Sequence, residues 1–247
     1  MTIKETHDTI LFVIKKTRNE FVSHEDIDRA LDIAQMSLFA ELIGNYRRYP
    51  EQAMVNSGRL LSDLNPFRER QQFLPGDYNS TTDPFALDDG ILVLPVDFLY
   101  FDGDGAYSVV MDGSNARNRP IEILPYDEFA ERSDSSLSPP TVTDPIGVFD
   151  GKGGTVNSVD IGEKMKLRLL PDAISGFIVY FRRPLLPVYA YTVVDRVETY
   201  DSAASVHLEW NDNCAHVIIK KALQTLGATT EDMVVLQEMV REESTSQ

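Results

Sequence analysis

The feature that most constrains the fold is a change of hydrophobic period along the chain. After Ser23, apolar side chains recur every three or four residues, and a second stripe of this kind begins at Cys214. Between the two stripes the apolar runs are short and are separated by Pro, Gly and Asp. The first period is that of one helix face, whereas short runs between turn residues are typical of strands. The sequence therefore predicts an α+β protein, helical toward both ends with a β-rich middle.

The first strong helix is predicted to begin after Ser23. This residue is a good N-cap, and Asp26 lies three positions later, close to a capping-box arrangement. The apolar stripe that follows ends near Gly44 and consists of Ile27, Ala30, Leu31, Ala34, Leu38 and Leu42. Shorter helices are expected over residues 9–18 and 50–61.

The second stripe predicts a helix that ends at Gly227, a residue suited to the left-handed conformation after a helix. Thr229 is the expected N-cap of a last helix, which runs to about Glu243. We expect these two helices to form a hairpin that packs with the N-terminal helices. The predicted parts are an N-terminal helical part (1–64), a β-rich middle (65–207) and the C-terminal helical hairpin (208–247).

The middle is predicted to form a central antiparallel β-sandwich or barrel-like sheet, with 177–181 as its central strand. The expected strands are 91–94, 98–101, 107–111, 121–124, 166–170, 177–181 and 188–194. Asp102 to Gly105 (DGDG) is expected as a tight turn between two strands. A calcium loop beginning at Asp102 would need an acid at its twelfth position, where Gly113 lies. One or two helical turns are expected over 126–132, and loops over 133–143 and 150–155.

The chain is acidic, with a net charge of -16. Such a protein is repelled by free nucleic acid and by anionic membranes. There is no Lys or Arg between Arg70 and Arg117, a segment that contains eight Asp residues. Two interpretations of this segment stay open. Asp favours turns, so the acids solvate loops; alternatively, they form a surface for a partner.

The residues that usually carry chemistry do not form a recognisable pattern. Cys214 is the only cysteine, so no intrachain disulfide forms, and its apolar neighbours indicate a buried, inert thiol. The four histidines (7, 24, 207 and 216) are dispersed and contain no paired zinc motif. We therefore expect no enzymatic activity, no metal and no cofactor. A carboxylate pair that cleaves glycosides stays an alternative, because acids are abundant.

The sequence shows neither the pattern of a membrane span nor that of a secretory signal. No apolar run approaches the roughly 18 residues of a membrane span. The N-terminal segment lacks the long apolar region and the small-residue cleavage site of a secretory signal. We expect the protein to be made and used in the cytoplasm, or assembled there into something larger.

Two basic clusters are candidate contacts for another protein subunit. Tyr46-Arg47-Arg48-Tyr49 interleaves aromatic and basic residues, a pattern that can stack on bases or grip phosphates. In so acidic a chain, a helix end or a protein contact is the favoured interpretation. Arg182 and Arg183 form a second pair that can match acids on a neighbouring subunit. The candidate subunit-interface residues are Tyr46, Arg47, Arg48, Tyr49, Arg182 and Arg183.

Several segments together resemble structural proteins of short-tailed bacteriophages. Residues 30–44 (ALDIAQMSLFAELIG) resemble the N-terminal helix of such proteins, especially those of crAss-like phages. From Leu169 to Gly227 the order is a strand ending in Tyr-x-Arg-x-Pro, a short polar stretch, and a helix with Ala-Leu and a closing Gly. This order resembles the head-to-tail adaptor, or connector ring, proteins of tailed phages. Residues 94–100 and 123–129 fit the same pattern.

The resemblance implies a non-enzymatic virion structural protein that forms a homo-oligomeric ring, commonly twelvefold. The ring would lie beneath the portal, join head to tail and surround the channel through which DNA is ejected. Its partners would be copies of itself, the portal protein and further tail or ring proteins, while DNA passes without specific binding. The location would be the virion, assembled in the host cytoplasm.

Two rival interpretations remain open. One is another virion attachment protein. The other is a carbohydrate-binding or glycosidase-like β-sandwich module. Trp210 is the only tryptophan, and sugar platforms usually need several exposed aromatic rings, which argues against the second rival.

Overall fold

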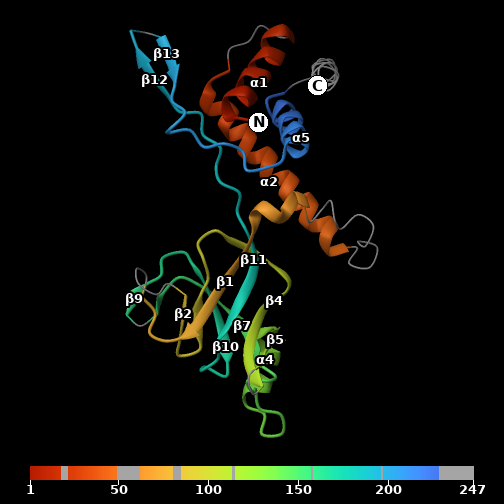
Figure 1. Cartoon of the computed structure of the whole chain (residues 1–247), viewed down its shortest axis with the longest axis vertical. Helices are drawn as coiled ribbons and strands as arrows, with labels where there is room; N and C mark the ends of the chain where they lie inside the picture. Colours follow the sequence, from red (N-terminus) through yellow and green to blue (C-terminus); the bar gives the residue numbers. More distant parts are fainter. Residues whose placement is uncertain are drawn as a thin grey trace. The chain divides into compact units, whose positions relative to one another are not determined.

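The computed structural model describes residues 1–17, 22–48, 62–79, 85–112, 115–156, 158–195 and 197–227. The chain divides into two compact units. The helical unit comprises residues 1–66 and 184–247, and the sheet unit comprises residues 67–183. The predicted α+β class is confirmed: helices form toward both ends of the chain, and the residues between them in the sequence form a large sheet (Figure 1).

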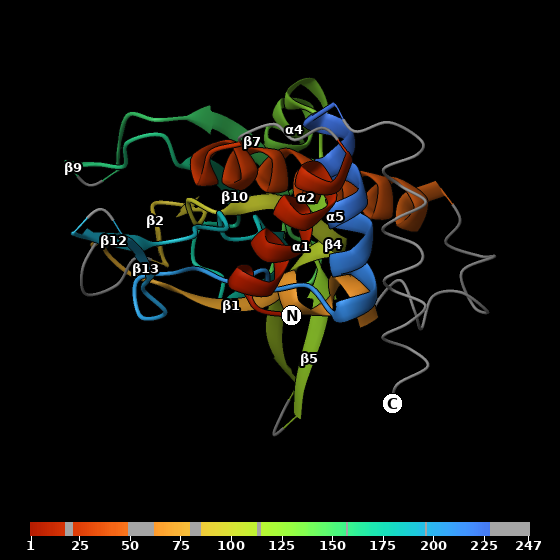
Figure 2. The same ribbon diagram turned by 90° about the horizontal axis from the view of Figure 1, so that it is seen from above.

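The helical unit brings together helices from the two ends of the chain, as predicted. They are α1 (Ile3–Thr17), α2 (His24–Arg48) and α5 (Asp212–Thr225), and α5 packs against α2 (Figures 1 and 2). Each buries one apolar stripe, such as Ile3, Ile10 and Val13 on α1. Burial of these stripes is the main force that holds the three helices together.

The ends of the helices follow local capping chemistry. The Ser23 hydroxyl oxygen accepts the Asp26 backbone N–H at 3.2 Å, so the predicted N-cap of α2 is confirmed. Asn211 caps α5 by accepting the Cys214 N–H at 2.9 Å. Gly227 follows that helix with φ of 83°, as its predicted closing role requires. The helices predicted over 50–61 and 229–243 lie outside the described residues.

The sheet unit contains a nine-stranded sheet in the order β5-β4-β11-β1-β2-β3-β10-β7-β6. A short 3₁₀ helix, η1 (Asn65–Phe67), precedes it. The strands are β1 (Arg68–Pro75), β2 (Ala86–Asp88), β3 (Ile91–Val93), β4 (Phe98–Asp112), β5 (Asn115–Pro120), β6 (Glu122–Ile123), β7 (Ile146–Lys152), β10 (Met165–Leu170) and β11 (Gly176–Arg182). A separate small hairpin pairs β8 (Thr155–Val156) with β9 (Val159–Asp160).

The large sheet is nearly closed, like a barrel. Its two edge strands, β5 and β6, are consecutive in the chain and are separated only by Ile121. The Ile121 N–H bonds back to the Ala106 carbonyl on β4 at 2.8 Å, and its side chain is buried. The chain thus passes directly from one edge of the sheet to the other. The interior is filled by apolar side chains that include Phe73, Leu92 and Leu167.

The sheet is mixed, so the prediction of an antiparallel sheet is wrong in this respect. β1 pairs in parallel with β2, and β6 pairs in parallel with β7. Neighbouring parallel strands cannot be joined by a tight turn and need a crossover. The helix α4 (Tyr126–Ser133) lies in the crossover from β6 to β7. The sequence located this helix but gave no sign of the pairing that it allows.

The tight turn expected at Asp102 to Gly105 is wrong, because these residues lie within the long strand β4. The pairing with β11 moves from Ile178–Ala106 to Tyr180–Phe101, so extra residues of β4 bulge out of the ladder. Both glycines of the bulge have positive φ, and a Cβ on Gly105 would lie 2.3 Å from the side chain of Phe101. Position 105 therefore requires glycine. Because glycine next to aspartate is also typical of tight turns, the bulge has the sequence of a turn.

The boundary between the units also differs from the expected one. The sheet unit ends at Arg183, so residues 184–207 of the predicted middle belong to the helical unit. There β12 (Tyr191–Val194) pairs with β13 (Val197–Tyr200) in a separate two-stranded sheet and, among the described strands, with no other. The loop expected over 150–155 is partly strand, since β7 runs to Lys152. Strand β5 was missed because its sequence, NARNRP, is polar.

Candidate functional site

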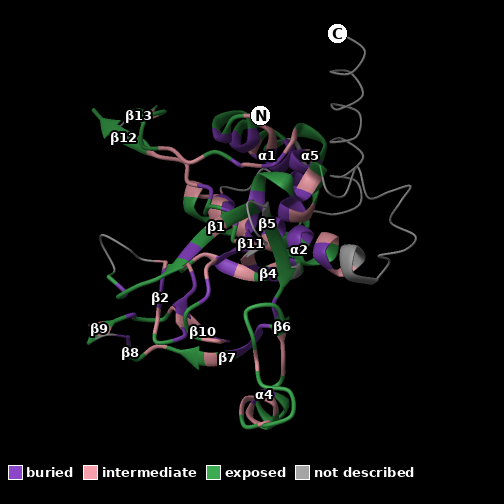
Figure 3. Cartoon of the chain, turned by 60° about the horizontal axis from the view of Figure 1, so that its bottom comes forward, coloured by how far each residue is buried: buried purple, intermediate pink, exposed green. Residues whose placement is uncertain are grey.

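The helical unit carries a projecting β-hairpin, which we call the hairpin arm (Tyr191–Tyr200). Val194 lies opposite Val197 near its tip, and Val193 lies opposite Glu198. These three valines are each about 60% exposed (61%, 61% and 62%). Figure 1 shows the arm extending away from the helices of its unit, and Figure 3 shows most of its two strands in the colour of exposed residues. A lone two-stranded hairpin is marginally stable in water, so its base must be fixed by other contacts.

Backbone hydrogen bonds close the base of the arm. Val188 and Val206 exchange two of them, at 3.1 and 2.9 Å. The Asp201 N–H donates to the Ala190 carbonyl at 2.9 Å. The Ser205 hydroxyl accepts the Ala190 N–H at 3.0 Å and donates to the Asp201 carbonyl at 2.6 Å. These bonds join the two chain segments that lead into and out of the arm.

A group of side chains then connects the base to the helices. We call it the histidine–tyrosine cluster, and its members are His7 on α1, His24 and Asp28 on α2, Tyr189 before β12, and Glu198 on β13. The Tyr189 ring stacks on His7 with centroids 4.6 Å apart and on His24 with centroids 4.2 Å apart. One ring therefore contacts both N-terminal helices.

The polar atoms of the cluster are paired with one another. The His7 side chain is fully buried; its Nδ1 lies 3.0 Å from His24 Nδ1, and its Nε2 lies 2.9 Å from Asp28 Oδ1. The Asp28 carboxylate also accepts the Tyr189 N–H, at 3.2 and 3.0 Å. His24 Nε2 lies 3.5 Å from Glu198 Oε2 on the arm itself. Burial and the nearby acid Asp8 raise the pKa of the Tyr189 hydroxyl, so this ring stays neutral at physiological pH.

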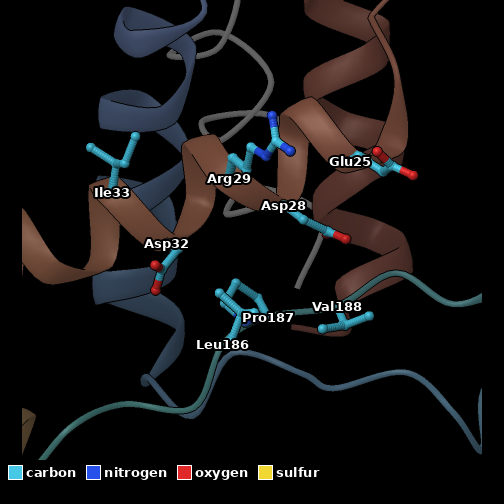
Figure 4. Close-up of a pocket in the computed structure, with 8 residues that line it drawn as sticks. All are labelled: Glu25, Asp28, Arg29, Asp32, Ile33, Leu186, Pro187 and Val188. Atoms are coloured by element: carbon cyan, nitrogen blue, oxygen red, sulfur yellow. The ribbon is translucent and has the colours of Figure 1, made fainter.

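A groove of about 410 Å³ lies beside the cluster, between α2 and the segment that leads to the arm. Its lining residues are Glu25, Asp28, Arg29, Asp32, Ile33, Leu186, Pro187 and Val188 (Figure 4). Two of its carboxylates already have donors: Asp28 binds His7, and Asp32 accepts the Gln35 amide at 3.0 Å. Ile33 and Leu186 are more than half exposed. The groove thus combines structural carboxylates with apolar borders and does not resemble a catalytic acid pair.

The sheet unit holds a second cluster of titratable groups. Both Glu69 oxygens are engaged, one by Arg182 Nε at 3.0 Å and the other by the Tyr180 hydroxyl at 3.0 Å. Burial, and then the nearby Glu69 carboxylate, raise the pKa of Asp97. Burial is also the main reason that the pKa of Tyr180 is raised. Because Glu69 already receives two donors, this cluster has the character of a structural network within the sheet.

The predicted interface residues fall in different units. Tyr46, Arg47 and Arg48 lie in the last turn of α2, but their side chains, and all of Tyr49, lie outside the described residues. The Arg182 side chain pairs with Glu69 within its own sheet. The Arg183 N–H donates to the Asp97 carbonyl at 2.7 Å. Part of the second basic pair therefore has an intramolecular role.

Other expectations concern the remaining chemistry-bearing residues. Cys214 is buried, as predicted. Within the described part of the chain, no group of three His, Cys, Asp or Glu residues is arranged to hold a metal ion. Trp210 is buried against Phe39 and donates to Gln35 at 3.4 Å, so it offers no open platform for a sugar ring. No helix in the described ranges is both long and apolar enough to span a membrane.

The histidine–tyrosine cluster was not predicted from the sequence, because its histidines are dispersed along the chain. His7 and His24 are 17 residues apart. One signal was present: His7 lies on the buried stripe of α1, at helical spacing from Ile3, Ile10 and Ile14. A histidine on such a stripe needs polar partners, since a buried imidazole without hydrogen bonds is costly.

Comparison with known proteins assigns the chain to no group. No protein-family model matches it, and no curated protein sequence matches it. The role of the hairpin arm must therefore follow from its geometry and from the properties of the chain that carries it.

Proposed function

We propose that this protein is a non-enzymatic virion subunit that assembles with copies of itself into a ring, and that the ring connects the portal of a phage head to the tail. The observation that carries the proposal is the hairpin arm. It presents exposed valines on a projecting element, while its base is fixed by a buried polar cluster. Such an arm is built for contact with another chain.

Charge favours an apolar contact between copies. Each chain has a net charge of -16, so identical copies repel one another unless contacts are apolar or match acids with bases. Val193, Val194 and Val197 give the arm an apolar surface at its far end. In a ring, each copy contributes one surface to the neighbour on one side and a different surface to the neighbour on the other. An arm that projects from its own unit meets this requirement.

The acidic charge also fits a conduit for DNA. A channel wall with many carboxylates repels phosphates, so DNA passes through without binding. Basic clusters on the same chain, such as Arg47-Arg48, would then meet acids of adjacent subunits. The ring's partners are copies of this chain, the portal protein and further tail or ring proteins.

The test is electron microscopy of the purified chain, alone and with its portal protein, together with mass measurement in solution. We expect closed rings for the natural chain. The variant Val193→Ser, Val194→Ser, Val197→Ser should keep its circular dichroism but lose the rings. The matched control is Val96→Ser, Val142→Ser, Val217→Ser, which changes three exposed valines outside the arm and should assemble normally. A chain that stays monomeric even beside its portal contradicts the proposal.

Another virion attachment protein is the second candidate, because an apolar arm serves a different partner chain as well as a copy. Mass spectrometry of particles would detect the chain in both cases, and only the ring function gives closed rings of the chain. The glycosidase-like alternative is disfavoured, since Trp210 is buried and both Glu69 oxygens are engaged. Turnover of glycan substrates in a hydrolase assay would support the glycosidase-like alternative.

A further inference from the structure

The helical unit carries both a projecting apolar tip and a hollow with apolar borders. The tip is the far end of the hairpin arm, where Val193, Val194 and Val197 are exposed. The hollow is the groove of about 410 Å³ beside α2. On its borders, Leu186 is 53% exposed and Ile33 is 57% exposed. Apolar side chains meet water at both places, so it is favourable to cover either of them.

The carboxylates inside the groove already have hydrogen-bond donors from their own chain. Figure 4 shows Asp28 and Asp32 pointing toward the segment of residues 186–188. Asp28 accepts the Tyr189 N–H at 3.0 Å, and Asp32 accepts the Gln35 amide at 3.0 Å. Each carboxylate therefore keeps a hydrogen bond when an apolar side chain displaces water from the groove.

The border of the groove and the tip of the arm carry opposite charges. Arg29 is exposed on the border, and within the described ranges it forms no ion pair. Asp195 is exposed in the turn of the arm beside Val194, and it too forms no ion pair with any residue that the structure describes. Glu25 lies one helical turn before Arg29 and is exposed, so water screens its repulsion of an incoming acid. The base on the border can therefore pair with the acid at the tip.

The arm of the same chain does not reach this groove. Val188 lines the groove, and its two backbone hydrogen bonds with Val206 close the base of the arm. From that base, the four residues of β12 carry the tip about 13 Å further. Figure 1 shows the arm extending away from the helices of its unit. The occupant that the chain itself supplies is therefore the arm of another copy.

We propose that the tip of the hairpin arm of one copy docks in the groove beside α2 of the next copy, with Asp195 facing Arg29. The volume of the groove lies within the range of about 300–1,000 Å³ found for small-ligand pockets, so it receives side chains of the tip and not the whole arm. Each copy uses its arm toward one neighbour and its groove toward the other, which is a head-to-tail contact. This inference rests on the proposed function and names the surface that receives the arm.

Chemical cross-linking of two cysteine variants tests the docking. Ile33→Cys places a thiol on the border of the groove, and Val194→Cys places one at the tip; both positions are exposed, whereas the natural Cys214 is buried. A short bis-maleimide should give covalent dimers when the two variants are mixed and none with either variant alone. The control mixes Val194→Cys with Val217→Cys, which changes an exposed position of α5 outside the groove, and should give no dimers.

The outcomes separate the docking from the ring. Dimers confined to the mixture of Ile33→Cys with Val194→Cys support the docking. Dimers of Val194→Cys with itself would show that arms meet arms, and a mixture without dimers would show that another partner covers the groove; either result overturns the docking. Closed rings without this cross-link would leave the ring function standing. Cross-linked chains that never close into rings would overturn the ring function and keep the docking.

A double-mutant cycle tests the charge pair. Arg29→Gln and Asp195→Asn each remove one charge, and Asn tolerates the positive φ of 52° at position 195 as Asp does. Each single variant should weaken assembly by about two- to fivefold, and the double variant should weaken it no more than either single one. Sedimentation equilibrium measures these changes. Asp77→Asn removes an exposed acid of the sheet unit and should leave assembly unchanged. Fully additive losses would overturn the pairing of Arg29 with Asp195.

Discussion

Strand β11 and the hairpin arm are built from similar residues but have opposite environments. β11 reads GFIVYFR and is buried along most of its length between β4 and β1. The arm strands read YTVV and VETY, pair only with each other, and are exposed. β-branched and aromatic residues favour the extended backbone in both places. Composition therefore identifies a strand, whereas the neighbours that cover it decide whether it stabilises the fold or serves as a contact surface.

The two regions are also stabilised in different ways. β11 contributes Ile178 and Tyr180 to the interior of the barrel-like sheet, and its other aromatic side chains, Phe177 and Phe181, are buried as well. The arm contributes little apolar burial of its own and depends on the polar bonds and stacked rings at its base. Mutations should therefore affect stability strongly in β11 and weakly at the tip of the arm.

The largest expected effect is that of Phe181→Ala in β11. The Phe181 side chain is 1% exposed, so its truncation leaves a cavity and should lower the free energy of unfolding by about 3–5 kcal/mol. Val193→Ala at the arm tip should change it by less than about 0.5 kcal/mol. Urea unfolding followed by circular dichroism measures both. Similar losses for the two variants would break the contrast between buried strand and exposed arm.

A smaller effect is expected for Gln35→Ala in the helical unit. Gln35 is buried; its amide donates to the Leu185 carbonyl at 2.9 Å, and its oxygen accepts the Trp210 N–H at 3.4 Å. Its removal takes away both of these buried hydrogen bonds and should cost about 1–3 kcal/mol.

Trp210 is the only tryptophan, so its fluorescence reports the unfolding of the helical unit and measures this loss directly. The control is Gln72→Ala on an exposed position of β1, which should leave the fluorescence transition in place. A Gln35→Ala variant as stable as the natural chain would show that these hydrogen bonds add nothing to the apolar packing of the helical unit.

The parts of the fold that sequence could predict are those determined by nearby residues. The cap at Ser23, the apolar stripes of α2 and α5, and the closing Gly227 all depend on neighbours within one or two turns. Strand β11 was located as an interior strand because its run of large apolar residues needs cover on both faces. Local patterns of this kind survive in any tertiary context.

The missed features depend on residues far apart in the chain. Asp102 is buried in β4 because Arg68, 34 residues earlier, pairs with it at 2.6 Å. The histidine–tyrosine cluster needs α1, α2 and the segment around Tyr189 at once. The parallel pairing of β6 with β7 depends on the register of the whole sheet. Apart from the place of His7 on the apolar stripe of α1, these long-range partners leave no pattern in the local sequence.

The next prediction concerns a buried hydroxyl in the sheet unit. Tyr78 is 2% exposed, and its hydroxyl has no hydrogen-bond partner in the described structure. Tyr78→Phe removes an unpaired polar group and should raise the free energy of unfolding by about 1 kcal/mol. Tyr180→Phe is the matched change at a hydroxyl that donates to Glu69 at 3.0 Å, and it should lower stability by about 0.5–1.5 kcal/mol. Urea titrations that gave both changes the same sign would contradict this assignment.

The smallest expected effect is a dependence of the stability of the sheet unit on pH, through the carboxyl group of Asp97. Asp97 precedes β4, and burial, followed by the Glu69 charge, raises the pKa of its carboxyl above its ordinary value. The folded chain thus binds a proton more readily at this site than the unfolded chain. The resulting stability is complete below the ordinary pKa and is lost as the pH rises through the raised one. At neutral pH the charged carboxylate therefore destabilises the sheet unit.

Asp97→Asn keeps the shape and removes the charge, so it should raise the melting temperature at pH 7 and lose this advantage as the pH falls below the ordinary range of an aspartate. The rise should be small, because Asp97 is only partly buried and water screens its charge. The exposed Asp77→Asn serves as the control and should give a smaller change at both pH values. A variant whose advantage persisted in acid would show that shape, not charge, limits the stability of the sheet at this position.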